Sequence, residues 1–189
     1  MSAAHLADER DILDPRSEVA RLVASALDDS AAFEVLMRSR LPRTYRLAMA
    51  ILGSESEAND AVQEAWVAAW RQLGSLADRG RFDPWIDQII VNACRMIVRR
   101  RARVREIRMP DGFDVSADAP GPDHIAEREA LERAFDRLSV DQRSILVLHH
   151  LERRSLASIA GVLGVPVGTA KSRLHAARAA LERTLELER

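Results

Sequence analysis

One segment near the middle of the 189-residue chain carries an aromatic group, amides and cations at helical spacing. Spacings of three and four place the following residues in one column on a helix: Trp85, Gln88, Asn92, Arg95 and Arg99. An indole ring gives an unpaired base a stacking surface worth roughly 1–3 kcal/mol. Amides read base edges, and arginines hold phosphates. The column predicts contact with nucleic acid, although half-buried packing of Trp85 beside ordinary surface residues explains it equally well.

A second polar set opens the last helix, expected from about Val167 to Leu185. Before it, Ser155 predicts the N-cap of a short helix that ends at Gly164, and Pro166 separates the two helices. A short helix, a tight turn and a basic helix are typical of a helix-turn-helix, whose second helix enters the major groove. The candidate DNA-contacting residues are Thr169, Lys171, Ser172, Arg173, His175 and Arg178. An ordinary helical hairpin is the alternative interpretation.

Positive charge is concentrated in the same two parts of the chain. Residues 85–108 hold seven arginines against two acids, and residues 153–183 hold five arginines and a lysine against one acid. Residues 109–127 hold five acids and no base. This layout indicates two nucleic-acid-facing modules on an acidic linker, although arginine-rich solvated helices would give similar counts.

The apolar periodicity predicts an all-α protein of two small helical domains joined by a flexible linker. We expect an acidic N-terminal extension at 1–30, a first domain at 31–103, a linker at 104–126 and a second domain at 127–189. The linker has no period and is marked by proline and glycine.

Several local features predict where helices begin and which side chains they bury. Within 31–52 a proline, Pro42, is expected to open a new helix. Asp83, followed by proline, is expected to be an N-cap, and Ser139 with Gln142 has the pattern of a capping box. Two indoles share the inner side of the helix at 56–73 and are both expected in the core: Trp66 and Trp70.

Several functional classes are excluded by what the sequence lacks. No apolar run approaches the roughly 20 residues that span a bilayer, and the N-terminus has no secretory pattern, so we expect a soluble, cytoplasmic protein without membrane contact of its own. Cys94, His149 and His150 lack metal-ligand spacing, so neither a metal nor a cofactor is expected. No nucleophile–base set or phosphate loop is present, and we do not expect an enzyme.

Two blocks of sequence resemble the extracytoplasmic-function (ECF) sigma factors, the smallest members of the primary-sigma superfamily. The first contains DAVQEAW and FDPWIDQIIVNACRMIVRRR, and the second contains LSVDQRSILVLHHLERRSLASIAGVLGVPVGTAKSRLHAAR. Together they cover residues 31–103 and 127–185. The resemblance implies a specificity subunit that binds core RNA polymerase, directs it to promoters and helps to melt the −10 region. Its second domain would be a helix-turn-helix of the sigma region 4 type, without a wing.

The resemblance also assigns roles to residues. Asp60, Gln63 and Glu64 would contact the clamp helices of the largest polymerase subunit, and the flap of the polymerase would be a further contact. The −10 element would be bound, partly as single strand, by Trp85, Gln88, Asn92, Arg95, Arg99 and Arg100, beside a base-capturing loop at 75–81. The six residues at the start of the last helix would read the −35 duplex. An anti-sigma factor would be a further partner.

This chain departs from the usual family pattern at some positions. Where the family often has LYRIARN, the chain has IDQIIVN. The chain therefore lacks a basic residue at Gln88 and has an acidic residue, Asp87, next to it. The alternative function is a stand-alone helix-turn-helix regulator that binds duplex operators without polymerase. The column at 85–99 and the polar face at 60–64 have no role in such a regulator.

Overall fold

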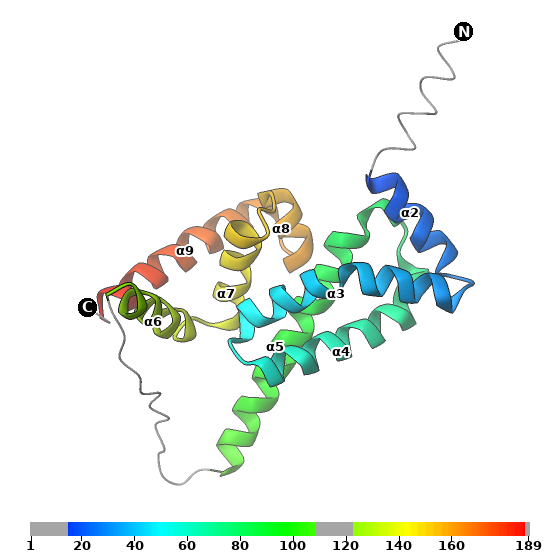
Figure 1. Cartoon of the computed structure of the whole chain (residues 1–189). Coiled ribbons are helices and arrows are strands. Elements are labelled where there is room, and N and C mark those ends of the chain that lie inside the picture. Colours follow the sequence, from blue (N-terminus) through cyan, green and yellow to red (C-terminus); the bar gives the residue numbers. More distant parts are fainter. Residues whose placement is uncertain (1–14, 109–122, 188–189) are drawn as a thin grey trace.

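The structure is a computed structural model that describes residues 15–108 and 123–187. Within those ranges it is built of helices without any strand, which confirms the expected all-α fold (Figure 1). The elements of the first domain are α2 (Pro15–Ser25), α3 (Ser30–Leu52), α4 (Glu55–Gln72), the short turns η1 (Leu73–Ser75) and η2 (Arg79–Arg81), and α5 (Phe82–Arg108). The elements of the second domain are α6 (Asp123–Asp136), α7 (Val140–Leu146), the π-helical turn η3 (Val147–Leu151), α8 (Leu156–Leu163) and α9 (Val167–Glu186).

The ends of the domains differ in detail from the expected ranges. Within the expected N-terminal extension, α2 and the turn after it place Val19, Val23 and Ala26 in the core, and α2 contacts α3 and η2. The helix α5 continues to Arg108, and α6 begins at Asp123. Most of the expected linker and residues 1–14 lie outside the described residues.

The helix α3 is continuous, so the expectation that Pro42 opens a new helix was wrong. Asp29 caps α3 by accepting from the backbone N–H of Ala31 at 2.8 Å, and the helix ends at Gly53 in the left-handed conformation (φ 72°). An internal proline costs about 3 kcal/mol because it removes one backbone hydrogen bond. Apolar residues buried before and after Pro42, such as Leu36 and Leu47, offset that cost by fixing both halves of α3 on the core.

The start of α5 also differs from its expectation. The helix begins at Phe82, one residue before Asp83, after the turn η2 whose cap is Asp78. The carboxylate of Asp83 instead accepts from Arg40 Nε of α3 at 2.9 Å. A long-range ion pair therefore takes the side chain that the local sequence assigned to a cap.

The two indoles of α4 have different environments. Trp66 is buried, and its N–H donates to the hydroxyl of Thr44 at 3.2 Å. Trp70 is 48% exposed, with its ring edge-on to Phe33 at 4.7 Å between centroids, so the expectation that it lies in the core was wrong. The buried face of α4 is therefore narrower than the apolar stripe in its sequence, which includes Trp70.

The predicted caps of the second domain are confirmed. Ser139 and Gln142 exchange both hydrogen bonds of a capping box, at 3.2 and 2.9 Å. Ser155 accepts from the N–H of Ser158 at 3.2 Å at the start of α8, and Gly164 ends that helix with φ 66°. Gly164 thus begins the turn between α8 and α9, the two helices of the helix-turn-helix.

The two domains pack directly on each other. The helices α7 and α8 contact α5, and α7 with η3 contacts α3 (Figure 1). We call this packing the closed arrangement. It places the first helix of the helix-turn-helix against the helix that carries the Trp85 column.

Candidate nucleic-acid interface

The start of α5 and the preceding loop form one hollow of about 420 Å³. The half-buried Trp85 lines it together with Gln88 and residues 75–78, and Phe82 supports the indole at 5.6 Å between ring centroids. The hollow thus combines a flat aromatic surface with an amide, which can stack on a base and bond to its edge. Trp85 and Gln88 therefore have a geometry that a base could use.

The next residues of the column are engaged to different degrees. Arg95 donates to the Asn92 side-chain oxygen at 2.9 Å and to Asp141 of α7 at 2.7 Å. Arg99 is exposed. The structure therefore brings Asn92 and Arg95 together, but directs the Arg95 cation toward a carboxylate of the other domain.

The sixth −10 candidate lies beside the polymerase candidates. Both terminal nitrogens of Arg100 donate to the two carboxylate oxygens of Glu64, across α5 and α4. Glu64 also lines a shallow hollow on α4 with Asp60 and Gln63, so these three residues share one face. The structure thus joins Arg100 to the α4 face by an ion pair.

The first two turns of α9 present most of the helix-turn-helix candidates to solvent. Lys171, Ser172, Arg173 and His175 are exposed, and Thr169 is half-buried. The Ser172 hydroxyl donates to the Thr169 carbonyl at 3.0 Å, which leaves its oxygen free to accept. These five residues form a continuous polar start to the helix.

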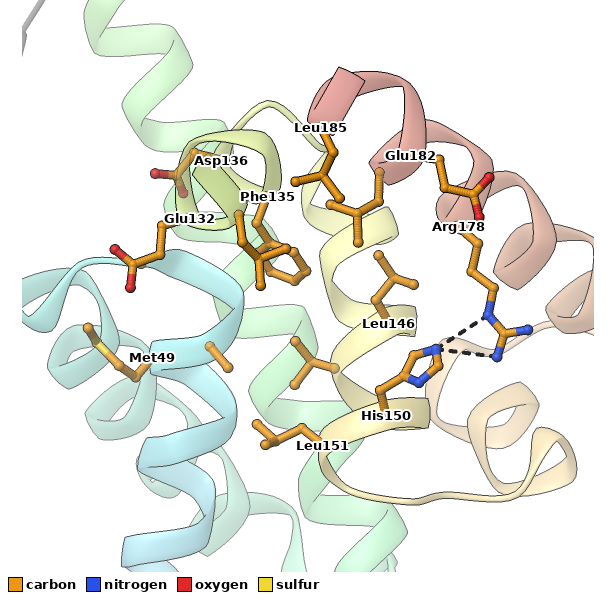
Figure 2. A pocket seen from close by; sticks show the side chains of 15 residues that line it. Met49, Glu132, Phe135, Asp136, Leu146, His150, Leu151, Arg178, Glu182 and Leu185 are labelled. Atoms are coloured by element: carbon orange, nitrogen blue, oxygen red, sulfur yellow. Dashed lines mark hydrogen bonds between the residues drawn. The ribbon is translucent and has the colours of Figure 1, made fainter. Parts of the chain in front are cut away.

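The last candidate, Arg178, lies apart from them. It faces a groove of about 780 Å³ lined by α3, α6, α7 and α9, where its Nε donates to His150 Nε2 at 3.3 Å (Figure 2). Burial, followed by the charges of His149 and Arg178, lowers the pKa of His150, so its imidazole is neutral at pH 7 and accepts this bond. The groove is otherwise largely apolar, with Leu151 58% exposed at its edge.

A buried carboxylate was not among the sequence-predicted site residues. Asp87 on α5 has no exposed side-chain surface and lies between Arg43 of α3 and Arg154 of the second domain, each at 2.6 Å. Burial raises the pKa of Asp87, against the opposite effect of the two arginines. The signal was present in the sequence, because Asp87 falls between Ile86 and Ile90 on the inner face, where an acid requires a cation.

The remaining reactive side chains form no further site among the residues that the structure describes. No three His, Cys, Asp or Glu side chains there are grouped to hold a metal ion. Cys94 is fully buried, and burial raises the pKa of its thiol to about 12. None of the described helices is long and apolar enough to cross a membrane.

Comparison with known proteins identifies both domains. Residues 36–104 match the family Sigma-70 region 2, and residues 128–181 match Sigma-70, region 4. The ECF RNA polymerase sigma factor SigE of Mycolicibacterium smegmatis is 33% identical over 189 residues, covering 94% of this chain and 73% of that protein. The ECF RNA polymerase sigma factor SigM of Mycobacterium tuberculosis is 35% identical over 173 residues, covering 90% and 85%.

Solved structures show the same fold. The sigma factor RpoE in complex with the anti-sigma factor NepR, from Bartonella quintana, aligns with a TM-score of 0.61 and 26% identity, over 83% of this chain and 98% of that chain. CnrH in complex with the cytosolic domain of CnrY aligns with a TM-score of 0.64 and 25% identity, over 90% and 99%.

A region 2 domain followed by a region 4 domain defines a small sigma factor. The chain belongs to the family of ECF RNA polymerase sigma factors, which direct the polymerase to promoters. The alternative of a stand-alone operator-binding regulator is not favoured, because the relatives match across both domains. These relatives are sigma factors, which are not enzymes.

Proposed function

We propose that this sigma factor binds polymerase, the −10 element and the −35 element with three separate surfaces. The α4 face with Asp60, Gln63 and Glu64 binds the clamp helices of core RNA polymerase. The hollow at Trp85, with the rest of its column, binds and melts the −10 element. The start of α9, with Lys171 and Arg173 among its cations, reads the −35 duplex. The hollow that joins Trp85 to Gln88 and residues 75–78 is the observation that carries the proposal.

Melting follows from differential affinity. Extruding a base costs a few kcal/mol, which the hollow must return by stacking and hydrogen bonds. A protein that binds the single strand better than the duplex shifts the equilibrium toward the open form. Trp85 supplies the stacking surface, and Gln88 supplies an amide for a base edge. Arg99 is exposed further along α5, and we assign it to a phosphate of the displaced strand.

The polymerase surface combines polar and apolar contacts. Next to the polar residues of α4, Val67 and Trp70 are 45% and 48% exposed, and they line a second, apolar hollow with Gln63. Aromatic residues are enriched in the cores of protein interfaces. We therefore place Trp70 in the polymerase contact, which gives a reason for an exposed indole.

An inhibitory partner is part of the proposal. Both similar solved structures are complexes, one described as with an anti-sigma factor and the other with the cytosolic domain of CnrY. An anti-sigma factor bound to this chain would find exposed apolar surface in the groove of Figure 2, which both domains line. We also propose a cytoplasmic location, where core polymerase and promoter DNA are found.

Run-off transcription with core RNA polymerase on a library of promoter-length DNA tests the proposal. We expect specific initiation that requires this protein and is lost in Trp85→Ala and Arg173→Ala. Arg183→Ala, a change of the same kind in the last turn of α9, is the matched control and should retain initiation. Duplex binding without polymerase and without initiation would instead support the stand-alone regulator.

A further inference from the structure

The second domain stands at the edge of the hollow proposed to take a −10 base. Gly161 of α8 lines that hollow together with Trp85 and Gln88. A Cβ atom built on Gly161 would lie 3.7 Å from the guanidinium of Arg81 in the loop before α5. The helix-turn-helix therefore restricts access to the single-strand surface of the first domain.

Three ion pairs hold the two domains in this position. Arg154 donates to Asp87 at 2.6 Å, and Arg43 donates to Glu152 at 3.1 Å. At the other side of α5, Arg95 donates to Asp141 at 2.7 Å. In the last pair, the carboxylate of Asp141 in the second domain binds Arg95, a cation that we assign to a DNA phosphate.

Asp87 is the centre of this contact because of its burial. A carboxylate with no exposed surface is stable as an ion only when cations and hydrogen bonds replace its water. Arg43 supplies one cation from the same domain, and Arg154 supplies the other only while the domains are packed together. Opening the domains replaces the second cation by water, whereas losing Arg154 in the closed arrangement leaves Asp87 partly uncompensated.

The closed arrangement is incompatible with a promoter. The −10 and −35 elements lie roughly 25 base pairs apart, or about 85 Å along B-form DNA at about 3.4 Å per base pair. In the structure, α8 packs against α9, the helix assigned to the −35 element, and also lines the hollow at Trp85, which is assigned to the −10 element. One molecule in this arrangement cannot bind both elements.

We propose that the closed arrangement is an autoinhibited state of the free sigma factor, with the Arg154–Asp87 ion pair as its latch. The proposal rests on the functions assigned above to α5 and α9. Binding of polymerase and promoter DNA separates the domains, and phosphates replace Asp141 on Arg95. Asp87 then retains Arg43, which keeps the first domain folded after the latch opens.

Energy transfer between dyes on the two domains tests the latch without polymerase or promoter. Cysteines introduced as Ser56→Cys and Glu186→Cys lie at exposed positions on α4 and α9, while the native Cys94 is buried. We expect high transfer in the otherwise wild-type chain and a clear fall in Arg154→Glu. Arg153→Glu makes the same charge change one residue away, at an exposed side chain, and should retain high transfer. Low transfer in the wild-type chain, or equal transfer in both variants, would overturn the latch.

Binding of a random-sequence, 5′-labelled single-stranded 20-mer tests the inhibition. If the open fraction of the wild-type protein is about one-tenth, Arg154→Glu should bind the 20-mer about tenfold more tightly. Arg153→Glu should bind the 20-mer more weakly than wild type does, because it replaces a positive charge by a negative one without separating the domains. Lower transfer in Arg154→Glu without tighter binding would show that the packing does not inhibit.

A second variant protects the test against misfolding. Asp141 is exposed in the first turn of α7, and Asp141→Asn removes the charge that pairs with Arg95 without changing the size of the side chain. Circular dichroism should therefore show nearly unchanged helix content. We expect a smaller fall in transfer than in Arg154→Glu, in the same direction. No change in transfer for a folded Asp141→Asn would remove this pair from the proposal. Failure of transcription with an intact latch would contradict the proposed function alone.

Discussion

The indole N–H of Trp66 donates to the hydroxyl of Thr44 across 3.2 Å and joins α4 to α3 in the core of the first domain. The Thr44 hydroxyl in turn donates to backbone carbonyls of α3, at 3.1 Å for Leu41. Both side chains are buried, so neither group has water as a substitute partner.

We expect Thr44→Val to destabilise the protein by about 1–3 kcal/mol, because it leaves the Trp66 N–H buried without an acceptor. Urea denaturation followed by tryptophan fluorescence measures the change. Thr44→Ser keeps the hydroxyl and is the matched control, with a smaller loss. Thr44→Val keeps the methyl group that Thr44→Ser removes, so equal losses would mean that the hydroxyl contributes no more to stability than the methyl group.

The native thiol should be unreactive. Burial raises the pKa of Cys94 to about 12, so almost none of it is thiolate at pH 8, and no exposed surface admits a reagent. We expect Ellman's reagent at pH 8 to react with the folded wild-type protein only as fast as it unfolds, and at once in strong denaturant. Ser56→Cys should add one fast-reacting thiol. Fast reaction of the wild-type thiol would mean that the first domain opens locally around α5.

A third prediction concerns the stacking of a base on Trp85. Trp85→Ala should weaken binding of the polymerase complex to a fork-junction promoter by about tenfold to a hundredfold, as expected for one lost stacking contact of about 1–3 kcal/mol. Trp85→Phe retains a ring and should lose less. Filter binding on fork and fully duplex DNA separates the effects, since the duplex affinity should change little. Equal losses on both DNAs would contradict a role for Trp85 with unpaired bases.

A fourth prediction distinguishes the cations of α9 by salt dependence. If Lys171 holds a phosphate, Lys171→Ala should weaken −35 duplex binding for all sequences and reduce the slope of log K against log salt by about 1. Arg173→Ala should in addition relax sequence preference, if its fork reads a guanine edge. Competition binding over a range of salt concentrations measures both. Unchanged slopes in both variants would remove the start of α9 from the DNA contact.

Local features of the second domain were predictable from sequence because they are set within a few residues. The capping box at Ser139 and Gln142, the cap at Ser155 and the stop at Gly164 each depend on backbone groups three or four positions away. The exposed polar start of α9 followed from the same local rules. The fold class and the helix-turn-helix therefore follow from residue order alone.

Features that depend on distant contacts were not predictable in this way. Asp83 pairs with Arg40 on α3 instead of capping α5, and Trp70 lies at the edge of the core instead of inside it. The packing between the domains depends on Arg154 meeting Asp87, which are 67 residues apart. Three candidate site residues also have partners far away in the sequence: Arg95 pairs with Asp141, Arg100 with Glu64 and Arg178 with His150.

The location of Arg43 on the same domain as Asp87 has a consequence for synthesis on the ribosome. Chains emerge from the N-terminus, and domains commonly fold as units while the rest is still being made. Once Arg108 has emerged, both residues are available, so the nascent first domain can bury its carboxylate with a cation already in place. If the proposed roles hold, the nascent protein leaves the hollow at Trp85 accessible until Arg154 has been made, and synthesis of the second domain then covers it.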